Sequence, residues 1–221
     1  MKEPLVDEAA YAGIDIDEIP FIETEPIQSI EVQQEIEQAF LLALPVVFTS
    51  MNAVEAVAYY LEETIPEWQI YCIGNTTNKL VIKHFGEAQI AGIADDAESL
   101  AALIVEDQFI DQVIFFCGDQ RRDELPQVLR NHDIDVNEIV VYQTIALPQK
   151  LEKAYHGILF FSPSAVASFF QKNKLPDTTV LFAIGNATAA AIKKFSANRI
   201  ITGDEPGKAE LVRKMISYFA P

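Results

Sequence analysis

The sequence has few of the groups on which metal sites, nucleotide sites and covalent mechanisms depend. Its two cysteines, Cys72 and Cys117, form no Cys-x-x-Cys pair and no cluster with histidine, so neither zinc nor a disulfide framework is indicated. No Walker loop is present and no Gly-x-Gly-x-x-Gly follows a predicted strand, which argues against a nucleotide site. No serine stands in a Gly-x-Ser-x-Gly motif, so a serine nucleophile is rejected.

Basic residues are also scarce. Sixteen lysines and arginines face 33 acidic residues, and the net charge of −17 argues against a nucleic-acid partner. Residues 1–78 contain a single basic residue, Lys2, among fifteen acids. We favour the interpretation that these acids form a solvated surface. The alternative is that the acidic segment belongs to a scaffold that binds a basic partner. An anionic ligand must be received by local groups, because the overall field repels it.

Long apolar runs are missing as well. The longest, Phe40–Phe48, is too short to span a bilayer and contains Pro45, and Met1–Gly13 is too acidic for a secretory signal. Half of the residues are nevertheless hydrophobic and 22% are charged, which predicts a well-buried core. We therefore expect a cytoplasmic monomer without a membrane segment, built as one large domain or two small ones.

What the sequence does contain is a repeated pattern. Ile73-Gly74-Asn75-Thr76-Thr77 ends one apolar run and opens a helical run, and Ile184-Gly185-Asn186-Ala187-Thr188 does the same 111 residues later. A second pair, Phe48-Thr49-Ser50-Met51-Asn52 and Phe160-Phe161-Ser162-Pro163-Ser164, repeats with an offset of 112 residues. Two motifs that repeat at nearly one spacing indicate that a strand–loop–helix unit occurs twice.

Each of these loops begins a predicted helix, where unpaired N–H groups can receive an anion. In the two Gly-Asn-x-Thr loops, binding and ordinary capping are equally favoured; the candidate residues are Gly74, Asn75, Thr77, Gly185, Asn186 and Thr188. In the two serine loops, capping is the stronger interpretation; the candidates are Ser50, Asn52, Ser162 and Ser164.

The order of the predicted elements indicates an α/β fold. Strands alternate with helices, which predicts parallel sheets with helices on both faces. We expect two doubly wound lobes with an internal pseudo-repeat: residues 29–137 form one, and residues 1–18 with 148–221 form the other. The second lobe has one strand fewer than a stable doubly wound sheet is expected to have. Two proline-bounded segments, residues 19–28 and 138–147, are expected to pair as a two-stranded ladder between the lobes, with a cleft above it.

Two further candidates lie in or beside the connectors. Arg121, in the turn after a predicted strand, can bind an anion or join a surface network with acids, and both interpretations are equally favoured. Tyr142 lies on a predicted connector strand, where its phenol can donate a proton or can simply reflect β-propensity.

The motifs above, together with Cys117-Gly118-Asp119, Arg121–Pro126 and Val141-Tyr142-Gln143-Thr144, resemble those of the uroporphyrinogen-III synthase family in order and spacing. The resemblance implies two α/β lobes joined by a ladder and a reaction in haem biosynthesis that needs no cofactor. In that reaction the linear tetrapyrrole hydroxymethylbilane loses its hydroxyl as water and closes to a macrocycle with ring D inverted. Main-chain amides in the inter-lobe cleft are expected to hold the substrate carboxylates.

The resemblance also implies roles for single residues. Tyr142 matches a tyrosine that assists departure of the hydroxyl, Thr77 matches a functional threonine, and the second loop offers Thr188. The family begins with a short strand ending in Thr-Arg-Pro, and Glu3-Pro4 falls roughly where that motif ends, so we expect this strand and its arginine to be absent. A non-catalytic bilobal module that closes on a small anionic ligand is the alternative function.

Overall fold

The chain divides into two compact units, each with its own parallel sheet. The computed structural model describes residues 3–61, 65–204 and 207–220, except for the side chains of Glu3 and Asn75. Unit 1 consists of Met1–Glu23 and Ile145–Pro221, and unit 2 consists of Thr24–Thr144. The predicted α/β class is confirmed in both units. In the part of the chain that the structure describes, no helix is long and apolar enough to cross a membrane.

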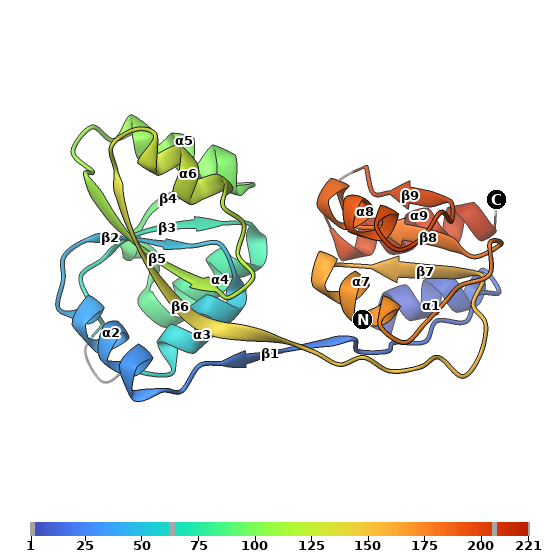
Figure 1. Ribbon diagram of the computed structural model, residues 1–221. Helices are drawn as coiled ribbons and strands as arrows, with labels where there is room; N and C mark the ends of the chain where they lie inside the picture. Colours follow the sequence, from blue (N-terminus) through green and yellow to red (C-terminus); the bar gives the residue numbers. More distant parts are fainter. Residues whose placement is uncertain (1–2, 62–64, 205–206, 221) are drawn as a thin grey trace. The chain divides into compact units, whose positions relative to one another are not determined.

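The sheet of unit 2 has the strand order β1-β6-β5-β2-β3-β4 (Figure 1). The strands from β6 to β4 are parallel to one another. β1 pairs antiparallel with β6, since the N–H of Ile27 donates to the carbonyl of Val141 and that of Leu147 donates to Phe21. The elements in chain order are β1 (Ile22–Pro26), α2 (Ile30–Phe40), β2 (Pro45–Phe48), α3 (Met51–Ala58), β3 (Gln69–Ile73), α4 (Asn75–Phe85), η1 (Glu87–Gln89), β4 (Ile90–Ala94), α5 (Ala97–Glu106), β5 (Gln112–Gly118), α6 (Glu124–Arg130) and β6 (Asp135–Ala146).

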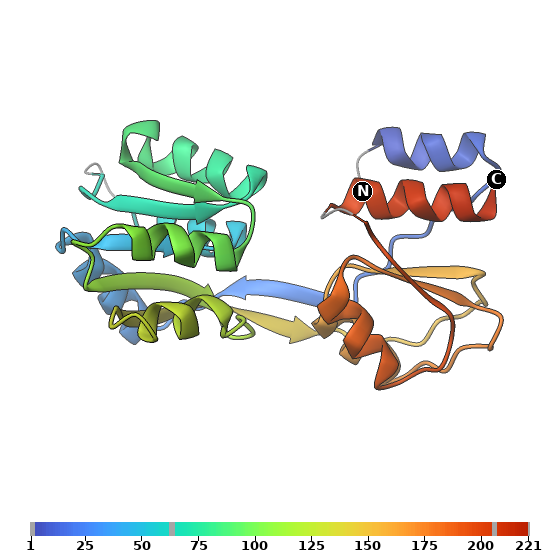
Figure 2. The same cartoon turned by 90° about the horizontal axis from the view of Figure 1, so that it is seen from above.

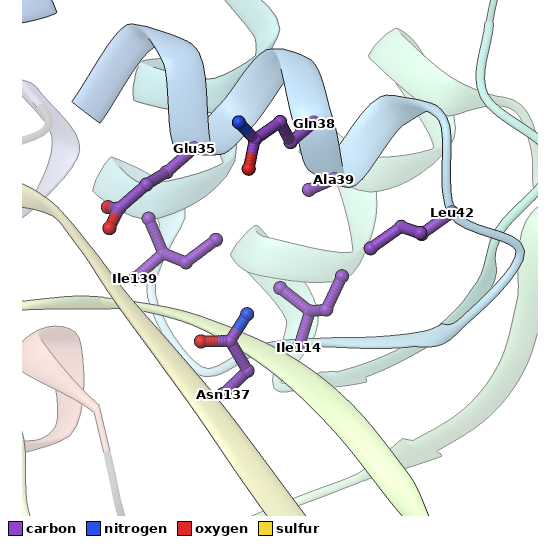
Figure 3. A pocket seen from close by; sticks show the side chains of 7 residues that line it. All are labelled: Glu35, Gln38, Ala39, Leu42, Ile114, Asn137 and Ile139. Carbon is purple, nitrogen blue, oxygen red and sulfur yellow. The ribbon is translucent and has the colours of Figure 1, made fainter. Parts of the chain in front are cut away.

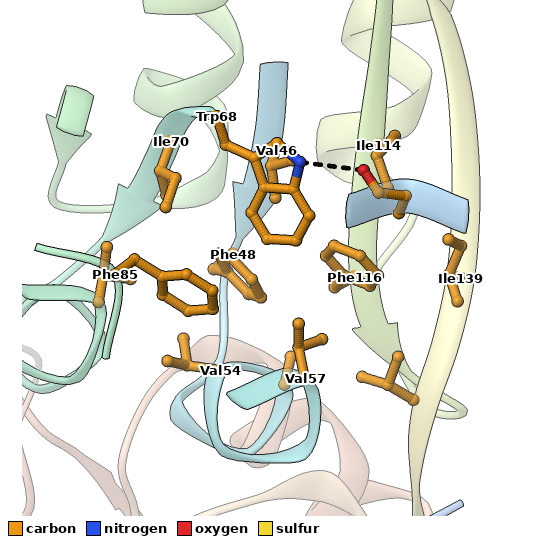
Figure 4. Close-up of a cluster of buried hydrophobic side chains, with 14 of the residues drawn as sticks. Val46, Phe48, Val54, Val57, Trp68, Ile70, Phe85, Ile114, Phe116 and Ile139 are labelled. Carbon is orange, nitrogen blue, oxygen red and sulfur yellow. Dashed lines mark hydrogen bonds between the residues drawn. The ribbon is translucent and has the colours of Figure 1, made fainter. Parts of the chain in front are cut away.

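Helices cover both faces of this sheet. Along β2, Val46 and Phe48 point to the core under α2, α3 and α4, and Val47 points to the core under α5 and α6. This alternation is the two-residue period of a strand that is buried on both faces. The single tryptophan, Trp68, lies in the first core, where its Nε1 donates to the carbonyl of Ala39 at 3.1 Å (Figure 4).

Unit 1 is built in the same way on a smaller sheet. Among the described residues this sheet has three parallel strands in the order β7-β8-β9. Helices α7 and α8 cover one face, and α1 and α9 lie side by side on the other (Figure 2). The elements are α1 (Glu3–Tyr11), β7 (Gly157–Phe160), α7 (Pro163–Phe170), β8 (Val180–Ala183), α8 (Asn186–Lys193), β9 (Ile200–Thr202) and α9 (Lys208–Phe219).

The bounds of α4 and β6 differ from the sequence prediction. Helix α4 begins directly after Gly74, so Asn75 and Thr77 lie in its first turn rather than in a loop. Strand β6 begins at Asp135 rather than Glu138, because its first residues pair with β5.

Candidate active site

In unit 2 the predicted site residues collect at the carboxyl edge of the sheet, where the parallel strands end. Ser50 follows β2, Gly74 follows β3 and Gly118 ends β5, and β2 lies between the other two strands. The helices that follow β2 and β3 cover one face, whereas the helix that follows β5 covers the other. Open α/β sheets bind their ligands where the winding reverses in this way. This edge is therefore the candidate site of unit 2.

The carboxyl edge of unit 1 carries the second set of predicted residues. Ser162 follows β7 and Gly185 follows the neighbouring strand β8. Lys208 opens α9 after β9, and its Nζ lies 5.5 Å from the ring centre of Phe161, which places a cation beside the end of β7. Lys208 is not among the residues predicted from the sequence, because nothing in its local pattern distinguishes it from a surface lysine.

The serine loops are N-caps. Ser50 Oγ accepts from the N–H of Asn52 at 3.2 Å, and Ser162 Oγ accepts from the N–H of Ala165 at 3.1 Å. The hydroxyls of Ser162 and Ser164 lie 3.2 Å apart. Each serine hydroxyl pairs with one of the first-turn N–H donors of its helix. These serines therefore cap their helices, which is the interpretation that the sequence favoured.

The Gly-Asn-x-Thr loops differ from the serine loops because their cap residues are glycines, which have no side chain to accept a hydrogen bond. Neither α4 nor α8 has a side-chain hydrogen bond at its cap residue. Gly74 has φ +65° and ψ 166°, a conformation that only glycine adopts readily. Apart from the glycine itself and the adjoining residues, no described heavy atom lies within 4 Å of a Cβ built on Gly74 or on Gly185. A ligand can therefore approach the first-turn N–H donors of both helices.

The threonines of these two loops are buried in the helix starts. Thr77 is 7% exposed and Thr188 is 2% exposed. Asn186 is exposed beside Thr188, whereas the side chain of Asn75 lies outside the described residues. Burial fixes the position of each threonine in the first turn, where the backbone N–H groups have no partner within the helix.

Tyr142 is positioned by a bulge and by a glycine. Cys117 pairs with Val140 but Gly118 pairs with Tyr142, so Val141 is an extra residue at the end of the ladder. The Tyr142 ring covers Gly118 so closely that a Cβ built there would lie 2.3 Å from Cζ and 2.7 Å from the phenol oxygen. Within the described residues, the phenol has no hydrogen-bond partner.

The loop after β5 holds the Tyr142 backbone in place. The N–H of Asp119 donates to the carbonyl of Tyr142 at 3.1 Å, and Asp119 Oδ1 accepts from the N–H of Thr144 at 2.8 Å. Gly118 and Asp119 thus support the tyrosine, a role that their place in the sequence motif did not predict. The signal in the sequence for this support was a glycine at the end of a strand whose other residues are mostly large and buried.

Arg121 is already paired with acids. Its guanidinium binds the carboxylates of Asp123 and Glu138, and Glu138 also accepts from Arg130 Nη2 at 2.6 Å. Burial alone would lower the pKa of Arg121, but the hydrogen bonds that its guanidinium donates to the two carboxylates raise it. The Arg–acid network, one of the two interpretations from the sequence, is therefore present and joins the turn after β5 to β6. Binding of an anion by Arg121 stays a prediction.

Both thiols are unsuited to chemistry, although they lie near the ends of their strands. Burial raises the pKa of Cys72 and of Cys117 to about 11. The thiolate is the reactive form of cysteine, so neither residue is a nucleophile near neutral pH.

A separate hollow of about 160 Å³ lies between α2 and the amino-terminal halves of β5 and β6 (Figure 3). Apolar and amide side chains and one carboxylate line it; the residues are Glu35, Gln38, Ala39, Leu42, Ile114, Asn137 and Ile139. Ile114 and Asn137 are the third residues of their strands, far along the chain from the carboxyl edge. The hollow is thus distinct from the candidate site.

Comparison with known proteins identifies the family. The sequence model of the family described as uroporphyrinogen-III synthase HemD matches residues 3–213. The chain belongs to this family. A uroporphyrinogen-III synthase of Saccharomyces cerevisiae is 25% identical over 194 residues, which cover 72% of this chain and 69% of the yeast protein. Membership makes this chain one of the cyclising lyases of haem biosynthesis and does not favour a non-catalytic module.

Solved structures of the family share the fold. A mutant uroporphyrinogen III synthase from the extremely thermophilic bacterium Thermus thermophilus has a TM-score of 0.64 at 14% identity, covering 98% of this chain and 94% of its own. The Helicobacter pylori 26695 protein has a TM-score of 0.61 at 19% identity, with 90% and 92% covered. The match extends over both units, so the mixed α/β architecture with parallel sheets is that of the family.

Proposed function

We propose that this chain converts hydroxymethylbilane to uroporphyrinogen III, closing the macrocycle with ring D inverted and releasing one water. The proposal is carried by membership in the uroporphyrinogen-III synthase family, which extends over residues 3–213. It is supported by the two carboxyl edges described above, each of which has a helix start free of side-chain caps.

The helix starts of α4 and α8 receive substrate carboxylates. Free N–H groups and the positive end of the helix dipole stabilise a carboxylate without any charged side chain, which suits a protein with a net charge of −17. Thr77 and Thr188 add one hydroxyl each beside these amides, and Lys208 adds a positive charge at the edge of unit 1. We infer that both units bind the same substrate molecule, because a linear tetrapyrrole carries carboxylates along its whole length.

Tyr142 donates the proton that allows the hydroxyl to leave. The C–O bond of the hydroxymethyl group breaks as the pyrrole nitrogen supplies electrons, and the oxygen leaves as water after it takes the phenol proton. Ring closure with inversion of ring D then forms two C–C bonds and breaks one, and it releases one proton, which restores the phenol. The free phenol at the carboxyl edge of unit 2 supports this role, as does the close packing of its ring on Gly118, which holds it in one orientation.

The activity is tested with freshly generated hydroxymethylbilane. The products are oxidised to porphyrins and the type I and type III isomers are separated by chromatography. We expect the type III isomer to predominate, in proportion to enzyme concentration. Formation of the spontaneous type I isomer alone would contradict the proposal and leave the chain as a binding module.

A further inference from the structure

Strand β6 is paired with β1 along its second half only. β1 ends at Pro26, and the N–H of the next residue, Ile27, donates to the carbonyl of Val141 at 2.9 Å. The chain then turns into α2, whose N-cap is Ser29. In the part of the chain that the structure describes, β6 has no strand neighbour other than β1 and β5. Residues 135–140 of β6 are therefore an open edge of the sheet on the side away from β5.

The backbone of this edge presents its hydrogen-bonding groups at alternate residues. The N–H of Asp135 donates at 2.8 Å to the carbonyl of Asp111, which directly precedes β5. In a parallel ladder the groups of one residue point to one neighbour and those of the next residue point to the other side. The residues whose groups point away from β5 are thus Val136, Glu138 and Val140. Among the described residues, the one partner on that side is Arg130, whose Nη2 donates to the Val136 carbonyl at 3.4 Å.

The hollow under α2 lies beside this edge (Figure 3). Asn137 and Ile139 of the edge strand line it together with Ile114 of β5. Leu42, which follows α2 and also lines the hollow, is 46% exposed. The apolar floor and the volume of about 160 Å³ suit one branched aliphatic side chain. A segment that lies along β6 can therefore bury such a side chain here.

The border of the hollow is acidic. Helix α2 contains three glutamates and no basic residue. One of them, Glu35, lies close to Ile139 in Figure 3, and its carboxylate has no partner among the described residues. An unpaired carboxylate beside an apolar pocket attracts a basic group. A second copy of this chain would place like charges opposite one another, so the net charge of −17 disfavours a dimer through this edge.

We propose that unit 2 binds an extended, basic peptide segment of another protein along residues 135–140 of β6. The peptide adds a strand to the sheet, and its backbone pairs with the outward N–H and C=O groups of β6. Alternate side chains of the peptide face α2, so an aliphatic residue enters the hollow and a lysine or arginine two residues along lies near Glu35. The carboxyl edge with the candidate active site is at the other end of the strands, so peptide binding is a function separate from the proposed reaction.

The experiment uses the full chain and the peptide acetyl-Lys-Thr-Leu-Thr-Lys-amide, which carries its leucine and both lysines on one face of an extended strand. Amide hydrogen exchange is followed residue by residue by NMR. In the protein alone we expect fast exchange at Val136 and Glu138 and slow exchange at Asn137 and Ile139, whose N–H groups point to β5.

With saturating peptide we expect exchange at Val136 and Glu138 to slow at least about tenfold, with no change at Asn137 and Ile139. The same peptide with glutamine in place of both lysines should bind more weakly, because it lacks the charges that Glu35 attracts.

The matched protein variants are Glu35→Lys and Glu37→Lys, which change the net charge equally on the same helix. Glu37 accepts from Gln33 Nε2 at 2.7 Å and does not line the hollow. We expect Glu35→Lys to raise the peptide Kd by about tenfold and Glu37→Lys by no more than about twofold. Unchanged exchange at Glu138, or equal effects of the two substitutions, would overturn the proposal. So would concentration-dependent protection of Glu138 without peptide, because a second copy would then occupy the edge.

Discussion

Tyr142 depends on a neighbour without a side chain. The bulge at Val141 turns the tyrosine over the end of β5, and only a glycine at position 118 leaves room for its ring. Asp119 then ties the backbone on both sides of Tyr142 to the loop after β5. The proposed proton donor is thus held by backbone contacts, which keeps its hydroxyl free for the substrate.

Replacing Tyr142 with phenylalanine removes this hydroxyl and keeps the packing on Gly118. We expect Tyr142→Phe to lower kcat for the type III isomer by about 100-fold or more, the usual contribution of a positioned acid, with little change in Tm. Initial rates and thermal unfolding measure the two effects separately. Parallel loss of rate and stability would make Tyr142 a structural residue.

Replacing Gly118 with alanine tests whether this glycine positions the ring of Tyr142. The new methyl would lie 2.3 Å from Tyr142 Cζ, so the ring must move, and we expect a cost of about 1–3 kcal/mol in stability together with a fall in kcat. In the double variant with Tyr142→Phe, the losses in kcat should not add, because both changes act on one phenol. Gly185→Ala is the control for stability, because no protein atom lies within 4 Å of its Cβ position. Additive losses in kcat would show that Gly118 does not act through the phenol of Tyr142.

At the scale of elements, two kinds of helix start follow the strands. Serine caps close α3 and α7, whereas α4 and α8 start at a glycine and keep their first-turn donors open. The motif repeat predicted all four helix starts, because strand, turn and helix signals are local. Which of them are capped could not be predicted, since Ser, Asn and Thr can all cap and the backbone angles decide which of them reaches a donor.

The open helix starts are tested by removing the threonine hydroxyls. We expect Thr77→Val and Thr188→Val each to raise KM several-fold with a small effect on Tm, because no described residue bonds these hydroxyls. Thr179→Val is the contrasting control: its hydroxyl donates to the carbonyl of Tyr155 at 2.9 Å, so its loss should cost about 1–3 kcal/mol in stability and leave KM unchanged. Unchanged KM in the first two variants would reduce both loops to ordinary helix starts.

For the whole molecule, the two units have separate cores of unequal size. The core of unit 2 covers both faces of a six-stranded sheet, whereas unit 1 has three described strands and partly exposed apolar residues at the edge of β7. The single tryptophan lies in unit 2, so its fluorescence reports only that unit, while circular dichroism reports both.

We therefore expect urea unfolding to begin at lower denaturant concentration by circular dichroism than by tryptophan fluorescence. Unit 1 should unfold first, because less apolar surface is buried around its sheet. Coincident transitions from the two probes would show that the units unfold together.

The sequence by itself determined the α/β class, the order of the elements and the repeated loops, because hydrophobic period and helix-start signals are properties of short segments. It also placed Tyr142, Thr77 and Thr188 among the candidates. The tertiary structure decided the rest: Arg121 pairs with Glu138 of β6, Gly118 makes room for Tyr142, and residues 14–20 form no strand although residues 135–139 do. Each of these depends on which neighbour the fold brings alongside, and a segment that reads as a strand becomes one only where a partner offers its hydrogen bonds.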